Sequence, residues 1–230
     1  MFKFDILVED FVGILTVVPK TLLLALVILL ISTFLGGIIA IIQQYKIPII
    51  SQLITVFKSF LRGTPAVVLL YIMYYALPQI SHLLLSLIGI EFNPNNLNPV
   101  ITVIVTFSLT LSAFQSEIIR GAFLSVNYGQ IEAAYSLGYN FLQTLWRVIV
   151  PQALTEALPD FLNSYMVIIK ALSLAFLITV VDIFAKAKIV GAMTFRYLEA
   201  FVAAALIYWC ISALLTYLVN RYEISLRKGH

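Results

Sequence analysis

The side chains that could carry out nucleophilic, redox or metal chemistry are few and lie far apart in the sequence. The chain has one cysteine, Cys210, and two histidines, His82 and His230. A lone cysteine cannot form a disulfide within the chain, and residues this distant assemble neither a metal site nor a set of nucleophile, base and orienting group. The sequence therefore predicts that the chain is not an enzyme and has no cofactor of its own.

Four polar side chains interrupt apolar runs and could interact with a transported molecule. Lys170 lies about ten residues, or about 15 Å, into one run, where an unpaired ammonium costs about 2.5–3.5 kcal/mol in lipid. It could hold a substrate carboxylate, with Ser173 close by in the sequence, or it could anchor a helix end or bind a neighbouring carbonyl. Ser112 and Gln115 could line a polar path or join helices by hydrogen bonds. These four residues form the candidate substrate path.

A pair of opposite charges follows Ser112 along the chain. Glu117 and Arg120 are three residues apart, a spacing that lets two side chains meet on one face of a helix. We therefore expect them to form a structural ion pair rather than a binding site.

The composition requires lipid as the solvent. Of 230 residues, 62% are hydrophobic and 11% are charged, whereas soluble domains are about half apolar and about a quarter charged. The net charge of +3 is small and the basic residues are scattered, so nucleic acid is not expected as a partner. The sequence predicts an integral membrane protein surrounded by membrane lipid.

Apolar runs long enough to cross a bilayer recur along the chain. A spanning helix needs about 20 apolar residues, and the alternating pattern of a membrane β-barrel is absent from the sequence. We therefore predict an all-α integral membrane protein, with a single transmembrane domain over residues 1–230. Five transmembrane helices are expected, at about residues 21–42, 66–90, 99–120, 161–183 and 199–220.

The basic residues predict the orientation of the chain. An odd number of spans places the two termini on opposite sides of the membrane, and the positive-inside rule assigns the more basic loops to the cytoplasm. The N-terminus is therefore expected outside and the C-terminus in the cytoplasm. The loops assigned to the cytoplasm hold Lys46, Lys58, Arg62, Arg120, Arg147, Arg221, Arg227 and Lys228, and the opposite side holds Lys186, Lys188 and Arg196.

The loop at residues 121–160, between the third and fourth predicted spans, is much longer than a helix hairpin requires. Its sequence predicts two short helices, because Gly138 suits the left-handed residue that ends a helix and Asn140 can cap the next one. Pro151 is expected to stop or kink the chain at its own position. A shared apolar face is predicted for Ile131, Ala134, Tyr135 and Leu137.

Two interpretations of this loop are open from its composition. It could be an amphipathic hairpin that lies on the membrane surface. A surface helix that binds anionic lipid is usually rich in Lys and Arg, and the centre of this loop has only Arg147. The apolar, nearly uncharged face therefore favours a protein partner.

The centre of the loop resembles a known family motif. Glu132-Ala133-Ala134 is followed by three residues, Gly138, nine residues and Val148-Ile149-Val150-Pro151. This pattern is similar to the EAA loop of ABC-importer permeases, which usually have Ile and Leu in place of Val148 and Val150. Segments similar to the polar-amino-acid branch of these permeases are Arg62-Gly63-Thr64-Pro65, Glu117-Ile118-Ile119-Arg120-Gly121 and Pro151-Gln152-Ala153-Leu154.

The resemblance implies the type I importer fold and the role of a permease subunit in the bacterial cell membrane. In that family two permeases lie side by side, a dimer of cytoplasmic ATPase subunits binds ATP and Mg, and an external substrate-binding protein delivers the substrate. This sequence has no Gly-x-x-x-x-Gly-Lys-Ser/Thr loop, which agrees with a separate ATPase. The resemblance assigns coupling to the ATPase to Glu132, Ala133, Ala134, Leu137, Gly138 and Asn140.

The family branch also implies the substrate, a polar amino acid or a close relative such as cystine, carried by alternating access. Related permeases tend to read Lys-Asp-Thr-Ser-Leu where this chain has Lys170-Ala171-Leu172-Ser173-Leu174, which leaves the particular amino acid open. Pairing with an identical or a sister permease is equally open.

The alternative function is an ATP-independent secondary transporter or channel. Such proteins use intramembrane carboxylates or broken helices for ion coupling, and the predicted spans have no Asp or Glu in mid-membrane. The sequence therefore favours the importer.

Overall fold

The computed structural model describes residues 2–227, and for residues 222–227 the helix backbone alone. Lys228, His230 and the side chain of Arg227 lie outside this described part. The described residues form helices and their connections, without strands. The helices are α1 (Phe4–Leu15), α2 (Val18–Gln44), α3 (Ile50–Gly63), α4 (Ala66–Leu87), η1 (Pro94–Asn96), α5 (Pro99–Ser125), α6 (Tyr128–Ser136), α7 (Phe141–Thr144), the π-helical η2 (Leu145–Ile149), α8 (Val150–Ala171), the 3-10 helix η3 (Leu172–Ile178), α9 (Ile183–Thr194) and α10 (Tyr197–Arg227).

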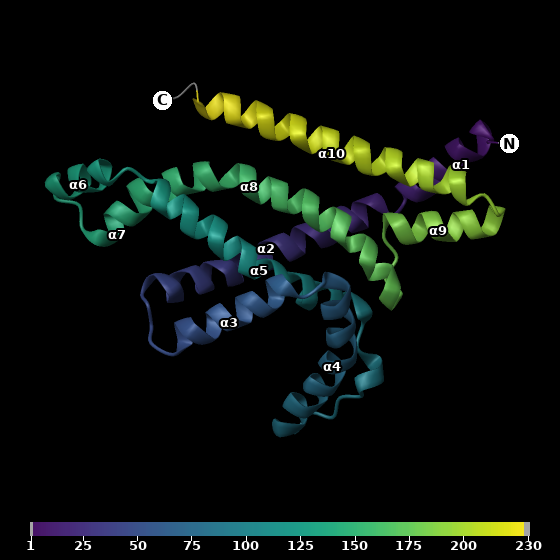
Figure 1. Cartoon of the computed structure of the whole chain (residues 1–230), viewed down its shortest axis with the longest axis horizontal. Helices are drawn as coiled ribbons and strands as arrows, with labels where there is room; N and C mark the ends of the chain where they lie inside the picture. Colours follow the sequence, from purple (N-terminus) through teal and green to yellow (C-terminus); the bar gives the residue numbers. More distant parts are fainter. Residues whose placement is uncertain (1, 228–230) are drawn as a thin grey trace.

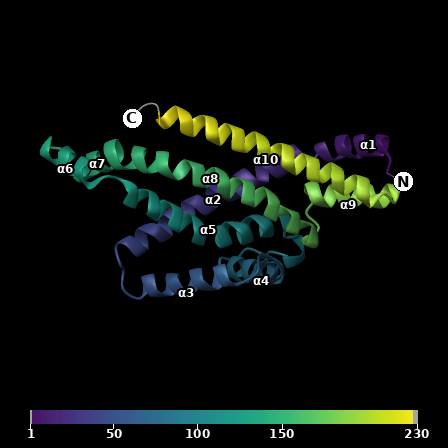
Figure 2. The same cartoon turned by 45° about the horizontal axis from the view of Figure 1, so that its top comes forward.

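The molecule is elongated, and its two ends are built differently. Figures 1 and 2 show α2, α5, α8 and α10 running roughly along the long axis. The short helices α6 and α7 lie at one end, and α1 and α9 lie toward the other (Figure 1). α10 begins beside α9 and runs back toward the α6–α7 end. The start of α1 and the end of α10 are therefore far apart along the long axis.

The core lies where α2, α5 and α8 pack together. Ile28, Val103 and Ile168, one from each helix, are fully buried in one hydrophobic cluster. α2 approaches α5 most closely at Gly36, where an added Cβ would lie 2.7 Å from the Cβ of Gln115 and 2.9 Å from the backbone nitrogen of Ser116. Glycine at this position therefore permits close helix contact, as small residues do in membrane proteins.

The structure confirms five helical segments that are long and apolar enough to span a membrane, and it corrects their boundaries. The third predicted span, at residues 99–120, continues to Ser125. The fourth was predicted at 161–183, but α8 begins at Val150 and leads into η3, which ends at Ile178. The segments found are Val18–Gln44, Ala66–Leu87, Pro99–Ser125, Phe141–Ile178 and Tyr197–Arg221.

Much of the predicted loop at residues 121–160 is helical in the structure. Pro151 does not stop the helix, because the helical run from Phe141 to Ile178 continues through it, with the π-helical η2 directly before it. Pro159 is tolerated inside the same helix. The segment between α5 and α8 is therefore residues 126–149, and the polar residues after it belong to the helix. The far end of this span is set by Thr179, whose left-handed φ of 68° ends η3.

Three helices were not predicted because they are too short to span a membrane. α1 packs against α9 and α10 through buried residues that include Leu7 and Ile14. α9 lies in the region predicted to join the last two spans. α3 occupies the region between the first two spans, where the sequence predicted a basic loop.

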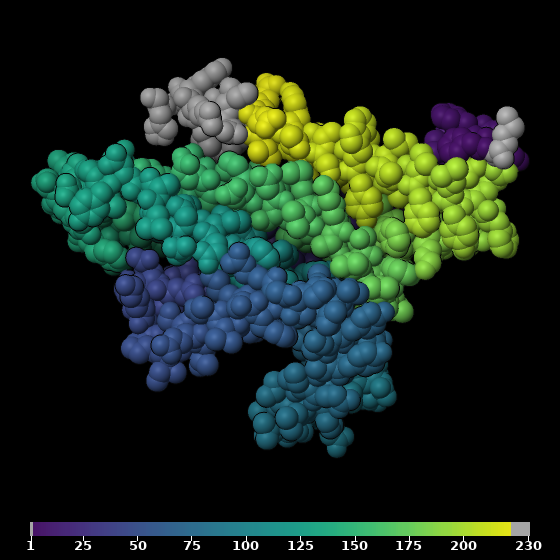
Figure 3. Space-filling view, in the orientation of Figure 1, coloured from purple at the N-terminus to yellow at the C-terminus, as the bar shows by residue number. Residues whose placement is uncertain are grey.

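α4 leaves the body of the molecule. It projects nearly perpendicular to the long axis in Figure 1 and is viewed almost along its length in Figure 2. Its buried residues, Leu69 and Leu70, lie in its first turns. The space-filling view shows the rest of α4 standing apart from the helices that form the core (Figure 3). Most of its apolar surface is therefore available to lipid or to a neighbouring subunit.

Candidate functional site

The α6–α7 hairpin, residues 126–149, is shaped by hydrogen bonds between residues close in the sequence. The Asn127 side chain caps α6 by accepting from the Gly129 N–H at 2.8 Å. Gly138, at φ 84°, closes α6, with its N–H donating to Tyr135 O at 2.9 Å. The Tyr139 N–H donates to Ala134 O at 3.1 Å, which completes a glycine-terminated helix end. The predicted break between two short helices at Gly138 is confirmed.

The start of α7 is fixed by a reciprocal cap. The Asn140 side chain accepts from the Gln143 N–H at 2.9 Å, and the Gln143 side chain accepts from the Asn140 N–H at 3.0 Å. This capping box satisfies two amides that would otherwise lack partners. The predicted capping role of Asn140 is confirmed. The turn between the helices therefore has a defined shape without help from distant residues.

The hairpin is also attached to both long helices that flank it. The Gln152 side chain in α8 donates to the side chain of Gln130 in α6. Ala122 at the end of α5 packs against Ala153 and Ala157 of α8, with half-buried apolar side chains around them. Because alanines allow close approach, α5 and α8 hold the base of the hairpin together. The hairpin is thus an extension of two helices that enter the core.

The outer surface of the hairpin carries several large apolar side chains among polar ones. Ala134 is buried, with 4% of its surface exposed, whereas Leu137 is 77% exposed. The apolar face predicted for these residues is therefore divided, because Ala134 turns inward and Leu137 and Tyr135 turn outward. Glu132 and Ala133 are exposed beside them. The exposed large apolar side chains of this region are Tyr128, Tyr135, Leu137, Phe141, Leu142 and Trp146.

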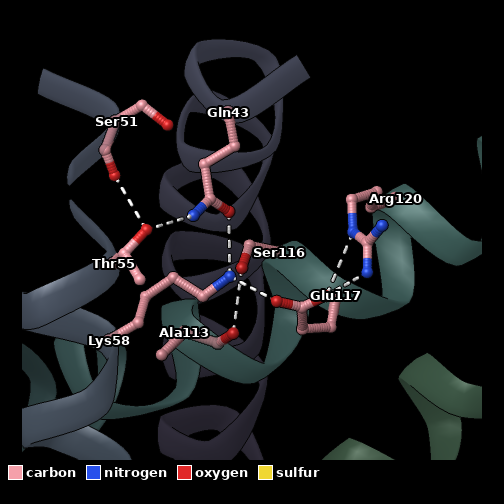
Figure 4. A network of polar contacts seen from close by, with 8 residues as sticks. All are labelled: Gln43, Ser51, Thr55, Lys58, Ala113, Ser116, Glu117 and Arg120. Carbon is pink, nitrogen blue, oxygen red and sulfur yellow. Dashed lines mark hydrogen bonds and ion pairs between the residues drawn. The ribbon is translucent and has the colours of Figure 1, made fainter. Parts of the chain in front are cut away.

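A network of polar side chains around the buried Lys58 joins α2, α3 and α5 (Figure 4). Lys58 of α3 is 5% exposed, and its Nζ lies 2.5 Å from Glu117 Oε1 and 2.9 Å from Gln43 Oε1. Arg120 binds the other carboxylate oxygen of Glu117 through Nε and Nη2, at 3.1 and 3.0 Å. Gln43 in turn donates to the Thr55 hydroxyl at 3.4 Å. We call Gln43, Thr55, Lys58, Glu117 and Arg120 the polar network.

The sequence identified only part of this network. The contact between Glu117 and Arg120 lies within one helix and follows from their spacing. Lys58 is 59 residues from Glu117 and was assigned to an exposed loop, so its contact could not be read from spacing. The available signal was a lysine in an amphipathic segment. If such a lysine is buried, its ammonium needs a carboxylate partner elsewhere in the chain.

Two residues of the predicted substrate path, Ser112 and Gln115, are buried between α5 and α2. The Ser112 hydroxyl donates to Leu109 O at 2.7 Å within its own helix. Gln115 is 0% exposed and lies against Gly36, and neither atom of its side-chain amide has a hydrogen-bond partner among the described residues. In the single chain both side chains therefore face another helix rather than an open path.

The other two, Lys170 and Ser173, lie at the junction of α8 and η3. Ser173 donates its hydroxyl hydrogen to Lys170 O at 2.7 Å. The Lys170 side chain is exposed, and no described residue accepts a hydrogen bond from its ammonium. These two residues are thus neighbours at one helix junction, whereas Ser112 and Gln115 are buried on α5.

The family comparison identifies what kind of membrane protein carries these features. Residues 32–228 match the family described as "Binding-protein-dependent transport system inner membrane component". The chain belongs to this family. It is the permease component of a binding-protein-dependent transport system and a multi-pass membrane protein. The alternative of an ATP-independent secondary transporter or channel is not supported by this membership.

Relatives and solved structures agree over nearly the whole permease. The "Probable amino-acid ABC transporter permease protein PatM" of Vibrio harveyi is 34% identical over 229 residues, which cover 100% of this chain and 98% of PatM. The "L-cystine transport system permease protein TcyL" of Bacillus subtilis (strain 168) is 35% identical over 97% of this chain and 91% of TcyL.

One solved structure, described as "Crystal structure of an amino acid ABC transporter with histidines", superposes with a TM-score of 0.80 at 26% identity. The superposition covers 98% of this chain and 99% of the chain in that structure. A structure of the MetNI methionine ABC transporter superposes with a TM-score of 0.67 at 14% identity, which shows a shared fold alone. The predicted all-α importer-permease fold is confirmed.

The end of the permease opposite the α6–α7 hairpin has polar contacts that the sequence did not predict. Asp182 caps α9 by accepting from Ala185 N–H at 2.9 Å and Phe184 N–H at 3.2 Å, and the Tyr208 hydroxyl donates to it at 3.1 Å. Burial raises the pKa of the Asp182 carboxyl, and these three hydrogen bonds oppose that effect. An aspartate directly before a helical segment is a known capping signal and could have identified this residue.

A second contact at this end attaches α1 to the start of α10. Glu199 accepts from the Lys3 N–H at 3.1 Å and from Arg196 Nη1 at 2.7 Å. Asp10 is buried nearby. Burial raises the pKa of its carboxyl, and the negative charges of Glu9 and Glu199 raise it further. These contacts explain why α1 is held against the bundle rather than lying free on a surface.

Proposed function

We propose that this permease forms half of the transmembrane translocation pathway of an ABC importer. The substrate is a polar amino acid or a close relative such as cystine. Support comes from relatives of nearly the same length whose names specify amino-acid and L-cystine transport. An extracytoplasmic substrate-binding protein delivers the substrate, and separate ATPase subunits with bound ATP and Mg drive alternating access.

The α6–α7 hairpin is the proposed docking site for the ATPase, and this feature carries the proposal. It combines a turn held by its own caps with exposed apolar side chains, among them Leu137. A group of exposed apolar side chains of this kind is characteristic of protein interfaces. Because α5 and α8 hold its base, a force applied to the hairpin acts directly on two core helices. Glu132, Ala133, Ala134, Gly138 and Asn140 complete the proposed coupling site.

The proposed arrangement places the hairpin and the end of α10 in the cytoplasm and α1 on the outer side. The basic residues predicted this orientation, and the position of the hairpin at the end opposite α1 supports it (Figure 1). A second permease, identical or related, lies beside this one. The exposed length of α4 is a surface that this second permease could cover.

The ATPase contact can be tested by co-purification. Leu137→Asp places a charge on the exposed face of the hairpin and leaves the capping side chains of Asn127 and Asn140 in place. We therefore expect at least about a tenfold loss of ATPase retained on the tagged permease. Leu198→Asp is the matched control, because Leu198 is also exposed but lies at the opposite end. Full retention of the ATPase by Leu137→Asp would contradict the docking site.

Lys170 is proposed to hold a carboxylate of the substrate, with Ser173 beside it. Support comes from its exposed ammonium at the α8–η3 junction, for which no described residue provides an acceptor. Replacement by methionine keeps the length of the side chain but removes the charge. We expect Lys170→Met to lower uptake by about tenfold, since a hydrogen bond to a charged group is lost. Unchanged uptake at an unchanged membrane level would exclude this role.

A further inference from the structure

α3 exposes apolar side chains along one side and buries a lysine on another. Lys58 and Leu61 are its buried residues, and Lys58 is fixed in the polar network. Leu53, Val56 and Phe60, spaced three and four residues apart, are all exposed. This spacing places them along one face of the helix, because three to four residues make one helical turn. α3 therefore has an apolar outer stripe directly beside a charged interior.

A hollow of about 420 Å³ lies at the polar network and is lined in part by α3, the helix that carries the stripe. It lies between the end of α2, the second half of α3 and α5. Part of its wall is drawn in Figure 4, which shows Lys58 held between Gln43 and Glu117. The residues that line it are Gln43, Thr55, Lys58, Ser59, Arg62, Gly63 and Glu117.

The charges around the hollow do not balance. Lys58 and Arg62 contribute two cations to its wall, and Glu117 contributes one carboxylate. Glu117 is already bound on one oxygen by Lys58 and on the other by Arg120. Its negative charge is therefore shared between two cations, and no carboxylate of the lining is left for Arg62. The hollow has an excess of positive charge and would attract an anion.

Arg62 has the donors that such an anion requires. Its guanidinium carbon lies 5.2 Å from the centroid of the Phe114 ring, which holds the group flat against α5. Within the described part of the chain, no oxygen accepts a hydrogen bond from this guanidinium. A planar guanidinium binds phosphate with two parallel hydrogen bonds. The Ser59 hydroxyl in the same wall can donate to a further oxygen, whereas the Thr55 hydroxyl already donates to Ser51 O at 2.8 Å.

We propose that this hollow binds the phosphate of an anionic phospholipid, whose acyl chains lie along Leu53, Val56 and Phe60. The apolar stripe distinguishes a lipid from free phosphate, because a dissolved anion would gain nothing from it. Basic pockets between membrane helices are known to bind acidic headgroups in this way. The site binds lipid, not the transported substrate, so it goes beyond the proposed transport function.

Native mass spectrometry of the purified transporter complex tests this site. Phosphatidylglycerol and phosphatidylcholine are added separately, and the fraction of complex that retains lipid is measured. We expect phosphatidylglycerol to be retained selectively, and Arg62→Gln to lower this retention by about fivefold, which corresponds to the loss of one basic contact. Arg62→Lys, which keeps the charge, should recover part of it. Lys46→Gln is the matched control, because Lys46 is an exposed basic residue in the α2–α3 turn, outside the hollow.

Each other outcome would overturn the proposal. Equal retention of the two lipids, or equal retention by wild type and Arg62→Gln, would exclude a headgroup site at Arg62. Equal losses in Arg62→Gln and Lys46→Gln would indicate general surface charge. Inorganic phosphate is added in a separate arm, and release of the lipid by millimolar phosphate would show a site for the free anion. ATPase co-purification, measured on the same samples, is expected to be unchanged in Arg62→Gln.

Discussion

The α6–α7 hairpin and the polar network lie in neighbouring parts of the permease but are held in opposite ways. The hairpin is exposed, and its turn is fixed by hydrogen bonds over at most five residues, such as those of Gly138 and Asn140. The network is centred on a buried lysine, and its central contact joins Lys58 to Glu117 across two helices. Because the hairpin is stabilised by local hydrogen bonds, its surface can be substituted without destabilising the helix bundle. Substitutions in the network are expected to destabilise the bundle.

The largest effect is expected where α2 and α5 touch beside the network. Gly36→Ala would place a Cβ 2.9 Å from the backbone nitrogen of Ser116, so the helices must separate. We expect a loss of about 3 kcal/mol in the free energy of unfolding, or roughly 6–12 °C in Tm. Thermal denaturation in detergent measures this shift.

Gly121→Ala is the matched control for that substitution. Gly121 is also a helical glycine in α5, but an added Cβ would meet nothing within 4 Å. Alanine there is expected to leave Tm unchanged or to raise it slightly, because glycine is the weaker helix former. Equal Tm shifts for the two variants would contradict the close contact at Gly36.

A smaller effect is expected from Glu117→Gln, which leaves the Lys58 ammonium buried without its carboxylate. Because Glu117 is partly exposed, we expect a loss of about 2 kcal/mol in the free energy of unfolding rather than the full cost of breaking a buried pair. Lys58→Met removes the buried charge itself and should cost less. The double variant should be close to Lys58→Met alone. A double variant less stable than Glu117→Gln would mean that the two side chains are not coupled.

The smallest effect on global stability is expected in the hairpin. Asn140→Ala removes one half of the capping box and costs about 1 kcal/mol in the local stability of α7. The turn lies outside the core, so Tm of the whole chain should change by less than about 2 °C. Amide hydrogen exchange should rise in α7 and remain unchanged in α5. Faster exchange throughout the bundle would show that the hairpin is not an independent unit.

The same contrast explains what could be predicted from the sequence. The break at Gly138, the cap at Asn140 and the contact between Glu117 and Arg120 depend on neighbours within a few residues, so residue type and spacing were sufficient. Lys58 was missed because its partner is 59 residues away. The sequence predicts the fourth span only after Asp160, because polar residues favour a loop, whereas the helix α8 already runs through them.

The predicted substrate path shows the same limit. Ser112 and Gln115 are predicted to line a path because polar residues in a span often do so. The spacing of residues does not show which face of a helix is covered by another helix. Gly36 allows α2 to pack closely against Gln115, and it lies 79 positions earlier in the chain. Composition and hydropathy were sufficient to predict five spans, whereas the sides of the spans depend on packing between distant residues.

The most direct test of the coupling role of the hairpin is ATP-driven uptake by the complex reconstituted in liposomes. Leu137→Asp and Leu198→Asp are compared with wild type, and Tm is measured for each. We expect Leu137→Asp to lose ATP-driven uptake by at least about tenfold with Tm unchanged, and Leu198→Asp to retain its response to ATP. Uptake by Leu137→Asp at the wild-type rate, or uptake by the wild-type permease without ATP, would contradict this account.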